Sequence, residues 1–94
     1  MVTRQIRVSG RVQGVGYRDA LRTEAMRAGV SGWVRNRADG SVEALLQGTA
    51  EAVGRILNWA SHGPGAARVA HLEAGPPALE FDRPYSRFER WPDL

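Results

Sequence analysis

Two glycines and an arginine occur where an expected strand gives way to an expected helix. They belong to the segment Gly10-Arg11-Val12-Gln13-Gly14-Val15-Gly16-Tyr17-Arg18. The first turn of a helix leaves backbone N–H groups without intrahelical partners, and the helix dipole adds partial positive charge there. Gly14 and Gly16 permit the backbone conformation that a curled row of N–H groups needs, and Arg18 adds a guanidinium that can close over it. The pattern predicts an anion-binding site, with a plain glycine turn beside a surface arginine as the alternative.

The composition excludes several other kinds of phosphate site. All thirteen cationic residues are arginine and none is lysine, so the lysine of a Walker A loop and Schiff-base chemistry are both excluded. The third glycine of the Rossmann fingerprint is also missing after Gly14 and Gly16. The chain has no cysteine, which excludes thiol catalysis and thiolate zinc sites and fits a reducing compartment. The net charge is +3, and a chain this rich in arginine, alanine and glycine can simply reflect the codon usage of a GC-rich genome.

A second polar residue is expected near the glycine loop. The segment Gly32-Trp33-Val34-Arg35-Asn36 reads as a strand that ends just before an Asp39-Gly40 hairpin turn. If the helix between the first two strands is a crossover, these strands run parallel and their carboxyl ends share one edge of the sheet. Asn36 then lies beside the loop, where a carboxamide can orient a water molecule as donor and acceptor. Taken by itself, Asn36 also suits the start of a turn.

The periodicity of the chain predicts an α+β fold. Residues alternate in polarity along the expected strands and recur at helical spacing in the expected helices, with Gly29 ending the first helix and Thr49 capping the second. Gly10 is expected on the buried side of the first strand, under a helix. Their order indicates a ferredoxin-like βαββαβ sandwich, with two helices on one face of an antiparallel sheet and an extra short C-terminal strand, in a single domain over residues 1–94. The expected strands are 4–12, 31–37, 41–47, 68–74 and 85–91, and the expected helices are 17–28 and about 50–60.

The two motifs together resemble the signatures of the acylphosphatase family. The likeness lies in Gly10–Arg18 and Gly32–Asn36, followed by Asp39-Gly40-Ser41-Val42-Glu43 and Gln47-Gly48. It extends over most of the chain and includes the order of the elements. The resemblance implies a hydrolase that splits the carboxyl–phosphate bond of small acyl phosphates without a metal or cofactor, with inorganic phosphate as product and inhibitor.

The resemblance also implies roles for individual residues. Arg18 and Asn36 would be the catalytic residues: Arg18 binds the phosphoryl group and Asn36 positions the attacking water. Asp19 would be the only carboxylate near this site. The chain departs from the family pattern at Arg37, at Ala44 and in the C-terminal segment Pro92-Asp93-Leu94, and none of these departures is expected to touch Arg18 or Asn36. The implied substrate-binding residues are Gln13, Gly14, Val15, Gly16, Tyr17 and Arg18.

Two other functions share the composition and the fold class. A nucleic-acid or phosphometabolite binding module would use the arginines, but the first strand has no aromatic pair for base stacking. A regulatory or maturation-factor domain would keep the fold and present the pocket to a partner protein. His62 and His71 lack a second ligand at metal spacing, and the three tryptophans suit packing better than stacking on bases. No signal peptide or membrane segment is apparent, so we expect a cytoplasmic protein that does not bind membranes. We also expect no nucleic-acid partner, and we expect a monomer because the chain is short and has no apolar excess.

Overall fold

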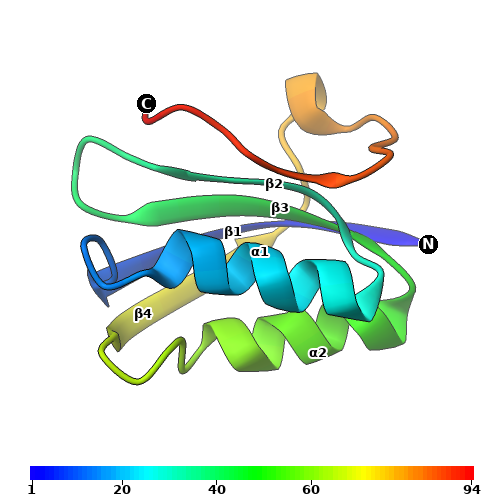
Figure 1. Ribbon diagram of the computed structural model, residues 1–94. Coiled ribbons are helices and arrows are strands. Elements are labelled where there is room, and N and C mark those ends of the chain that lie inside the picture. Colours follow the sequence, from blue (N-terminus) through cyan, green and yellow to red (C-terminus); the bar gives the residue numbers. More distant parts are fainter.

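The computed structural model describes residues 1–94 and confirms the expected order of the elements (Figure 1). Two helices and five strands follow one another as β-α-β-β-α-β-β, with one short 3-10 helix before the last strand. The elements are β1 (Val2–Arg11), α1 (Tyr17–Ala28), β2 (Ser31–Asn36), β3 (Val42–Gly48), α2 (Ala50–Ala60), β4 (Arg68–Gly75), the 3-10 helix Leu79–Phe81 and β5 (Phe88–Arg90).

The strands form one sheet in the order β4-β1-β3-β2-β5. β3 pairs antiparallel with both β1 and β2, so β1 and β2 run parallel to each other with β3 between them, as the crossover argument predicts. β4 pairs antiparallel with the outer edge of β1. β5 pairs parallel with β2, which makes the sheet mixed rather than purely antiparallel. The carboxyl ends of β1 and β2 therefore meet at the same edge.

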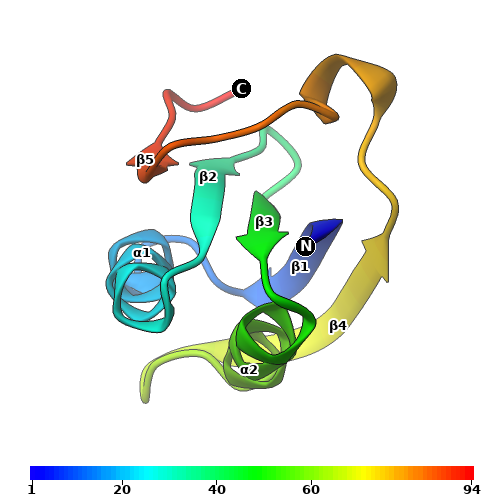
Figure 2. The same cartoon turned by 90° about the vertical axis from the view of Figure 1, so that its right-hand side faces the viewer.

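Both helices cover one face of this sheet, and the hydrophobic core lies between the helices and the sheet (Figure 2). α1 contributes Tyr17, Leu21 and Ala25 at helical spacing, and Gly29 ends it in the left-handed conformation. α2 begins at Thr49, whose hydroxyl accepts a hydrogen bond from the N–H of Ala52 at 3.1 Å. The sheet contributes alternate residues to the same core, namely Ile6, Val8, Val34, Val42, Ala44 and Leu46.

The second face of the sheet is also covered, which the alternation pattern did not predict. The chain after β4 passes over this face (Figure 2), and every residue of β3 is buried as a result. Trp33 is fully buried there, stacked on Trp91 with ring centroids 4.4 Å apart and packed edge-on against Phe81 at 4.9 Å. Three aromatic rings far apart in sequence thus form a second, smaller core.

Two local expectations are wrong. Gly10 is exposed, and no helix covers it; instead it stands at a β-bulge where β1 shifts register against β4. A Cβ at Gly10 would collide with the backbone carbonyl of Arg68 on β4, so it is a neighbouring strand that requires the glycine. The last strand is limited to Phe88–Arg90, because the N–H of Tyr85 donates to the side chain of Gln47 on β3 at 2.8 Å instead of pairing with β2.

Candidate functional site

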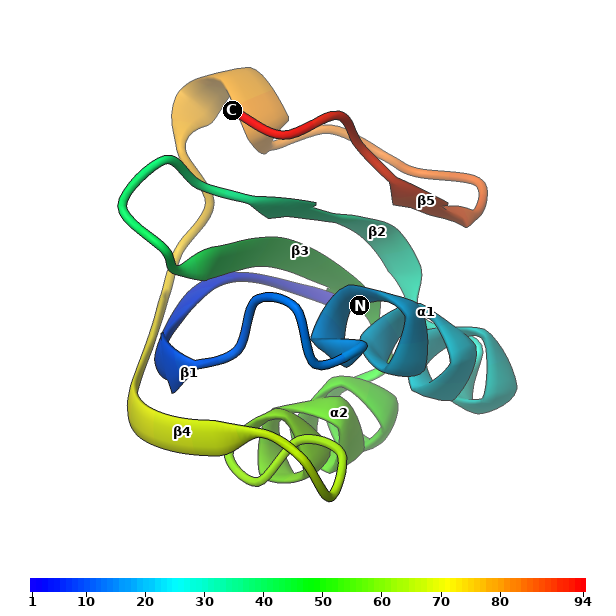
Figure 3. The same cartoon turned by 60° about the vertical axis from the view of Figure 1, so that its left-hand side comes forward.

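The loop after β1 and the end of β2 form a cavity of about 180 Å³ at one edge of the sheet. Figures 1 and 3 show this loop at the same end of the molecule as the β2–β3 hairpin and the C-terminal segment. The structure thus brings the two predicted motifs together although they are distant in the sequence. The residues that line the cavity are Val12, Gln13, Gly14, Gly16, Tyr17, Arg18, Asp19, Asn36 and Arg90.

The backbone of the loop presents free N–H donors. Gly14 and Gly16 have φ angles of 75° and 78°, the left-handed region that residues with a Cβ rarely adopt. The N–H groups of residues 13–16 donate no hydrogen bond within the protein, and the first helical bond of α1 runs from Ala20 N to Gly16 O at 3.0 Å. A row of unpaired donors at the positive end of a helix dipole is the arrangement that binds phosphate and other anions.

Arg18 adds a positive charge to this row. Its side chain is 21% exposed, and Nη1 contacts Oδ1 of Asp93 at 2.7 Å. Asp93 is 62% exposed, so water competes for both groups and the pair contributes little to stability. A phosphate dianion that enters the cavity can therefore take over this guanidinium at small cost.

Asn36 supplies a buried acceptor with no partner. The residue is 8% exposed, and Oδ1 of its side chain is buried without a hydrogen bond in the protein. An unpaired buried carbonyl oxygen is destabilising, which calls for a functional or solvent partner. Since Asn36 lines the same cavity as Arg18, a water molecule held by this oxygen would lie in the cavity beside the bound anion.

Gln13 connects the loop to the β2–β3 hairpin. Its Nε2 donates to the carbonyl oxygens of Arg37 and Ser41, both at 2.9 Å. The turn itself is held by Asp39, which accepts hydrogen bonds from the N–H and hydroxyl of Ser41; these bonds lower the pKa of that carboxyl below its ordinary value. The side chain of Gln13 thus fixes the distance between the loop and Asn36, and only its backbone N–H remains available for an anion.

Tyr17 secures the start of α1 against the second helix. Its hydroxyl donates to the carbonyl oxygen of Ala60 at 2.6 Å, and its ring lies 5.6 Å from that of Trp59. Burial raises the pKa of the Tyr17 hydroxyl, so this group stays protonated and keeps its bond to α2. Of the predicted binding residues, Tyr17 can therefore offer its backbone N–H to an anion, while its side chain serves packing.

Asp19 is the one carboxylate that lines the cavity. Its Oδ1 contacts Nη1 of Arg90 at 2.8 Å, and Arg90 lies at the rim of the same cavity. Neither histidine lies there: His62 contacts the carbonyl oxygen of Asn58 at 3.0 Å, and His71 is on β4. The polar part of the site therefore consists of backbone donors, two arginines, one ion-paired carboxylate and two carboxamides, of which that of Gln13 is bound to the hairpin.

The C-terminal segment touches both candidate catalytic residues, contrary to expectation. Asp93 contacts the side chain of Arg18. The N–H of Leu94 donates to the backbone carbonyl oxygen of Asn36 at 2.9 Å, which leaves the side-chain oxygen of Asn36 without a partner. The cause is the stacking of Trp91 on Trp33, with a hydrogen bond from Trp91 N to Val34 O at 2.9 Å, which keeps the chain alongside β2. The aromatic residue three positions from the end was the only signal in the sequence for this contact.

Comparison with known proteins identifies the relatives of this chain. The family model described as acylphosphatase matches residues 4–89. The chain is 50% identical to an acylphosphatase of Rhodopseudomonas palustris over 99% of this chain and 97% of that protein, and 48% identical to one of Thiobacillus denitrificans over 99% and 100%. The fold is similar to the crystal structure of acylphosphatase from Bacillus subtilis, with a TM-score of 0.87 and 34% identity over 97% of this chain and 99% of that one.

Proposed function

The chain belongs to the acylphosphatase family, and on that premise we propose that it hydrolyses the carboxyl–phosphate bond of small acyl phosphates. The observation that carries the proposal is the row of unpaired N–H groups at residues 13–16, beside Arg18 and across from the unpaired Oδ1 of Asn36. Donors for a phosphoryl group and an acceptor for a water molecule line one cavity.

In this mechanism the loop and Arg18 bind the phosphoryl group. The N–H groups of residues 13–18 and the guanidinium of Arg18 donate to its non-bridging oxygens, on which charge is spread in the transition state of phosphoryl transfer. These donors are held in place before the substrate arrives, since Gln13 fixes the loop to the hairpin and Tyr17 fixes the helix to α2. Preorganised donors in a partly closed cavity can supply most of the required stabilisation.

Asn36 positions the attacking water in line with the leaving group. The water oxygen bonds to phosphorus, the bond between phosphorus and the acyl oxygen breaks, and its electron pair leaves with the carboxylate. The proton of the water passes to a phosphate oxygen of the substrate itself. A carboxylate is a good leaving group, so no strong general base is needed, and Asp19 remains paired with Arg90.

Each of these steps uses residues of this chain alone, and we propose a reaction without metal or cofactor. Turnover should persist when the enzyme and buffer are treated with a chelator, and loss of activity on chelation would contradict this mechanism. Inorganic phosphate binds the same loop as the substrate does, so we expect competitive inhibition by the product.

The setting of the enzyme is also a proposal. We propose a cytoplasmic monomer whose partner is the small-molecule substrate, with no nucleic acid involved. The absence of cysteine suits a reducing compartment. No helix of the structure has the length and apolar character to cross a membrane. Sedimentation analysis at micromolar concentration should give one species of 10.3 kDa, and a stable dimer would contradict the monomer.

The test of the function is phosphate release from benzoyl phosphate by the wild type and by Arg18→Ala, in chelator-treated buffer. Wild type should turn the substrate over, and the variant should lose about 10²-fold or more in kcat/KM, the effect of removing a main transition-state donor. Arg55→Ala is the matched control, because Arg55 is an exposed helical arginine that pairs only with Glu51. Absence of phosphate release by the wild type would refute the proposed function.

A further inference from the structure

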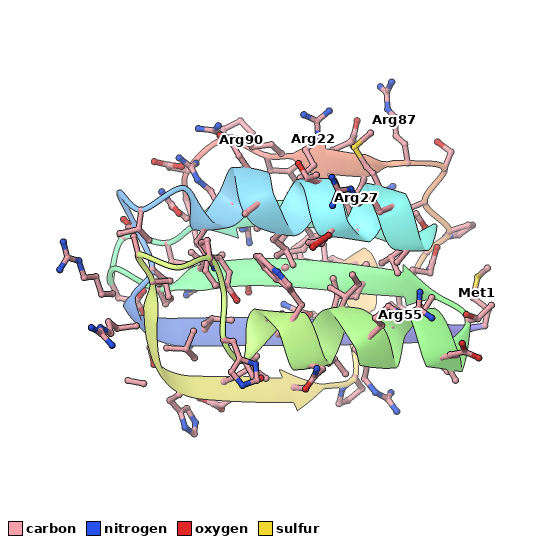
Figure 4. The ribbon with its side chains drawn as sticks, turned by 60° about the horizontal axis from the view of Figure 1, so that its bottom comes forward. Met1, Arg22, Arg27, Arg55, Arg87 and Arg90 are labelled. Carbon is pink, nitrogen blue, oxygen red and sulfur yellow. The ribbon has the colours of Figure 1, made fainter.

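A row of four arginines runs along the seam between α1 and β5, starting at the catalytic cavity. Arg18 and Arg22 are one helical turn apart on α1, while Arg87 and Arg90 stand just before β5 and at its end. Figure 4 shows the side chains of Arg22, Arg87 and Arg90 projecting outward from this edge of the molecule. At this seam, arginines from two elements gather beside the site.

Three of these four arginines have a carboxylate partner and one does not. Arg18 pairs with Asp93 at 2.7 Å, Arg90 with Asp19 at 2.8 Å and Arg87 with Glu89 at 3.3 Å. Arg22 forms no ion pair, and its single hydrogen bond is a long one of 3.4 Å from Nε to the carbonyl oxygen of Phe88. The terminal nitrogens of Arg22 therefore carry an uncompensated charge in the middle of the row.

A recess in the surface lies next to this free guanidinium. Its volume is about 360 Å³, and Arg90 lines both this recess and the catalytic cavity. A substrate with its phosphoryl group on the loop must direct its acyl portion out of the cavity, and the wall formed by Arg90 leads to Arg22. About one helical turn, four residues or about 6 Å along the axis, separates Arg22 from Arg18. The residues that line the recess are Arg22, Arg87, Phe88, Glu89 and Arg90.

We propose that Arg22, with Arg90 beside it, binds a second anionic group on the acyl portion of the substrate. The preferred substrates are then acyl phosphates that also carry a carboxylate or a phosphate, about one helical turn from the reacting phosphorus. This inference rests on the proposed function, since it names the substrate class of the same site. Arginine suits the role because its planar fork donates two parallel hydrogen bonds to a carboxylate or phosphate.

The test compares the binding of two stable probes that differ by one carboxylate, phenylphosphonate and 4-phosphonobenzoate. We expect wild type to bind 4-phosphonobenzoate about tenfold more tightly, the gain from one added charge-assisted hydrogen bond. In Arg22→Gln the ratio of the two dissociation constants should fall to about one. An unchanged ratio in this variant would overturn the inference.

Arg27→Gln is the matched control for long-range electrostatics. Arg27 is on the same helix and carries the same charge, but its side chain is 75% exposed on the side that faces α2. Figure 4 shows Arg27 apart from Arg87 and Arg90. The variant should keep the tenfold ratio, and an equal loss in Arg27→Gln and Arg22→Gln would contradict a local subsite.

The binding test and the activity test have independent outcomes, so the subsite and the reaction can each be refuted without the other. Absence of benzoyl phosphate turnover with a normal ratio of probe affinities would refute the proposed reaction and leave an anion-binding site with two contacts. Turnover of benzoyl phosphate with equal affinity for the two probes in wild type would refute the subsite and leave the reaction intact. The corresponding pair of substrates, benzoyl phosphate and 4-carboxybenzoyl phosphate, should show the preference in KM rather than in kcat.

Discussion

Arg18 and Arg35 are both arginines that contact a carboxylate at hydrogen-bonding distance, yet their surroundings differ. Arg18 meets Asp93 at 2.7 Å, and Asp93 is 62% exposed. Arg35 meets Glu43 at 2.9 Å, and Glu43 is 5% exposed. The first pair lies at the rim of the cavity, and the second lies on the face of the sheet that the C-terminal segment covers.

The carboxylate of Glu43 has three partners in the second cluster. Arg35 and Arg37 both contact Oε1, and the amide of Gln5 donates to Oε2 at 3.0 Å. The guanidinium of Arg35 also lies over the ring of Trp33, 5.0 Å from its centroid. In the cavity, by contrast, loop N–H groups and Oδ1 of Asn36 have no partner. Nε of Arg37 and Nε1 of Trp33 are also buried without a partner in the second cluster, but neither residue lines the cavity. The comparison shows that unpartnered groups gathered around a cavity, rather than the presence of arginine, distinguish the binding site from a structural cluster.

The largest effect that separates the two regions is the loss of activity on removing Arg18. Arg18→Ala should lower kcat/KM for benzoyl phosphate about 10²-fold or more, while its melting temperature stays near that of wild type. The surface pair with Asp93 adds too little stability for its loss to unfold the protein. Phosphate-release kinetics and thermal unfolding of the same sample check both halves, and unfolding of the variant at room temperature would contradict the assignment.

Asn36→Ala should lower turnover by about 10²-fold as well, the scale for losing one positioned polar group in the transition state. Because Asn36 acts on the water and not on the phosphoryl group, the loss should reside in kcat, with KM close to wild type. Steady-state kinetics with benzoyl phosphate separates the two parameters. A defect confined to KM would instead assign Asn36 to substrate binding.

Glu43→Gln should lower the stability of the fold, whereas the two preceding variants lower turnover. It leaves two arginines without their buried carboxylate, so the free energy of unfolding should fall by about 3 kcal/mol, as for other broken buried ion pairs. Urea unfolding followed by tryptophan fluorescence measures this change. Glu51→Gln is the control, since Glu51 is 86% exposed and pairs only with Arg55; its effect should stay below about 0.5 kcal/mol. Equal destabilisation by both variants would remove the distinction between the two regions.

Asp93→Asn should have the smallest effect. An exposed ion pair contributes about 0–1 kcal/mol, so kcat/KM should change by about fivefold at most and the melting temperature by a few degrees. Kinetics on benzoyl phosphate beside Arg18→Ala tests this. A loss as large as that of Arg18→Ala would show that Arg18 depends on Asp93 for its position.

The sequence predicted the helix-covered half of the molecule and the proximity of Asn36 to the glycine loop. Alternation of apolar residues, the cap at Thr49 and the stop at Gly29 are local signals, and a right-handed crossover is enough to bring Asn36 to the loop. The covered second face was missed because Phe81 and Trp91 lie in segments without periodicity. Their contact with Trp33 depends on the path of the whole chain after β4, which no local pattern encodes.

For the same reason the sequence did not reveal which polar groups were satisfied. The two hydrogen bonds of Gln13 to the hairpin, and the contact of Asp93 with Arg18, join residues 24 to 75 positions apart. A motif identifies the residue types at a site. Only the folded chain determines that Gln13 acts through the hairpin and that Asn36 retains a free oxygen.

The central claim is that the free N–H groups of the loop bind the phosphoryl group together with Arg18. Titration of the ¹⁵N-labelled protein with inorganic phosphate, followed by amide NMR, tests it most directly. The account predicts that the largest saturable shifts occur at residues 13–18, and that Arg18→Ala weakens the binding at least about tenfold. Shifts confined to other residues, or equal affinity in the variant, would contradict it.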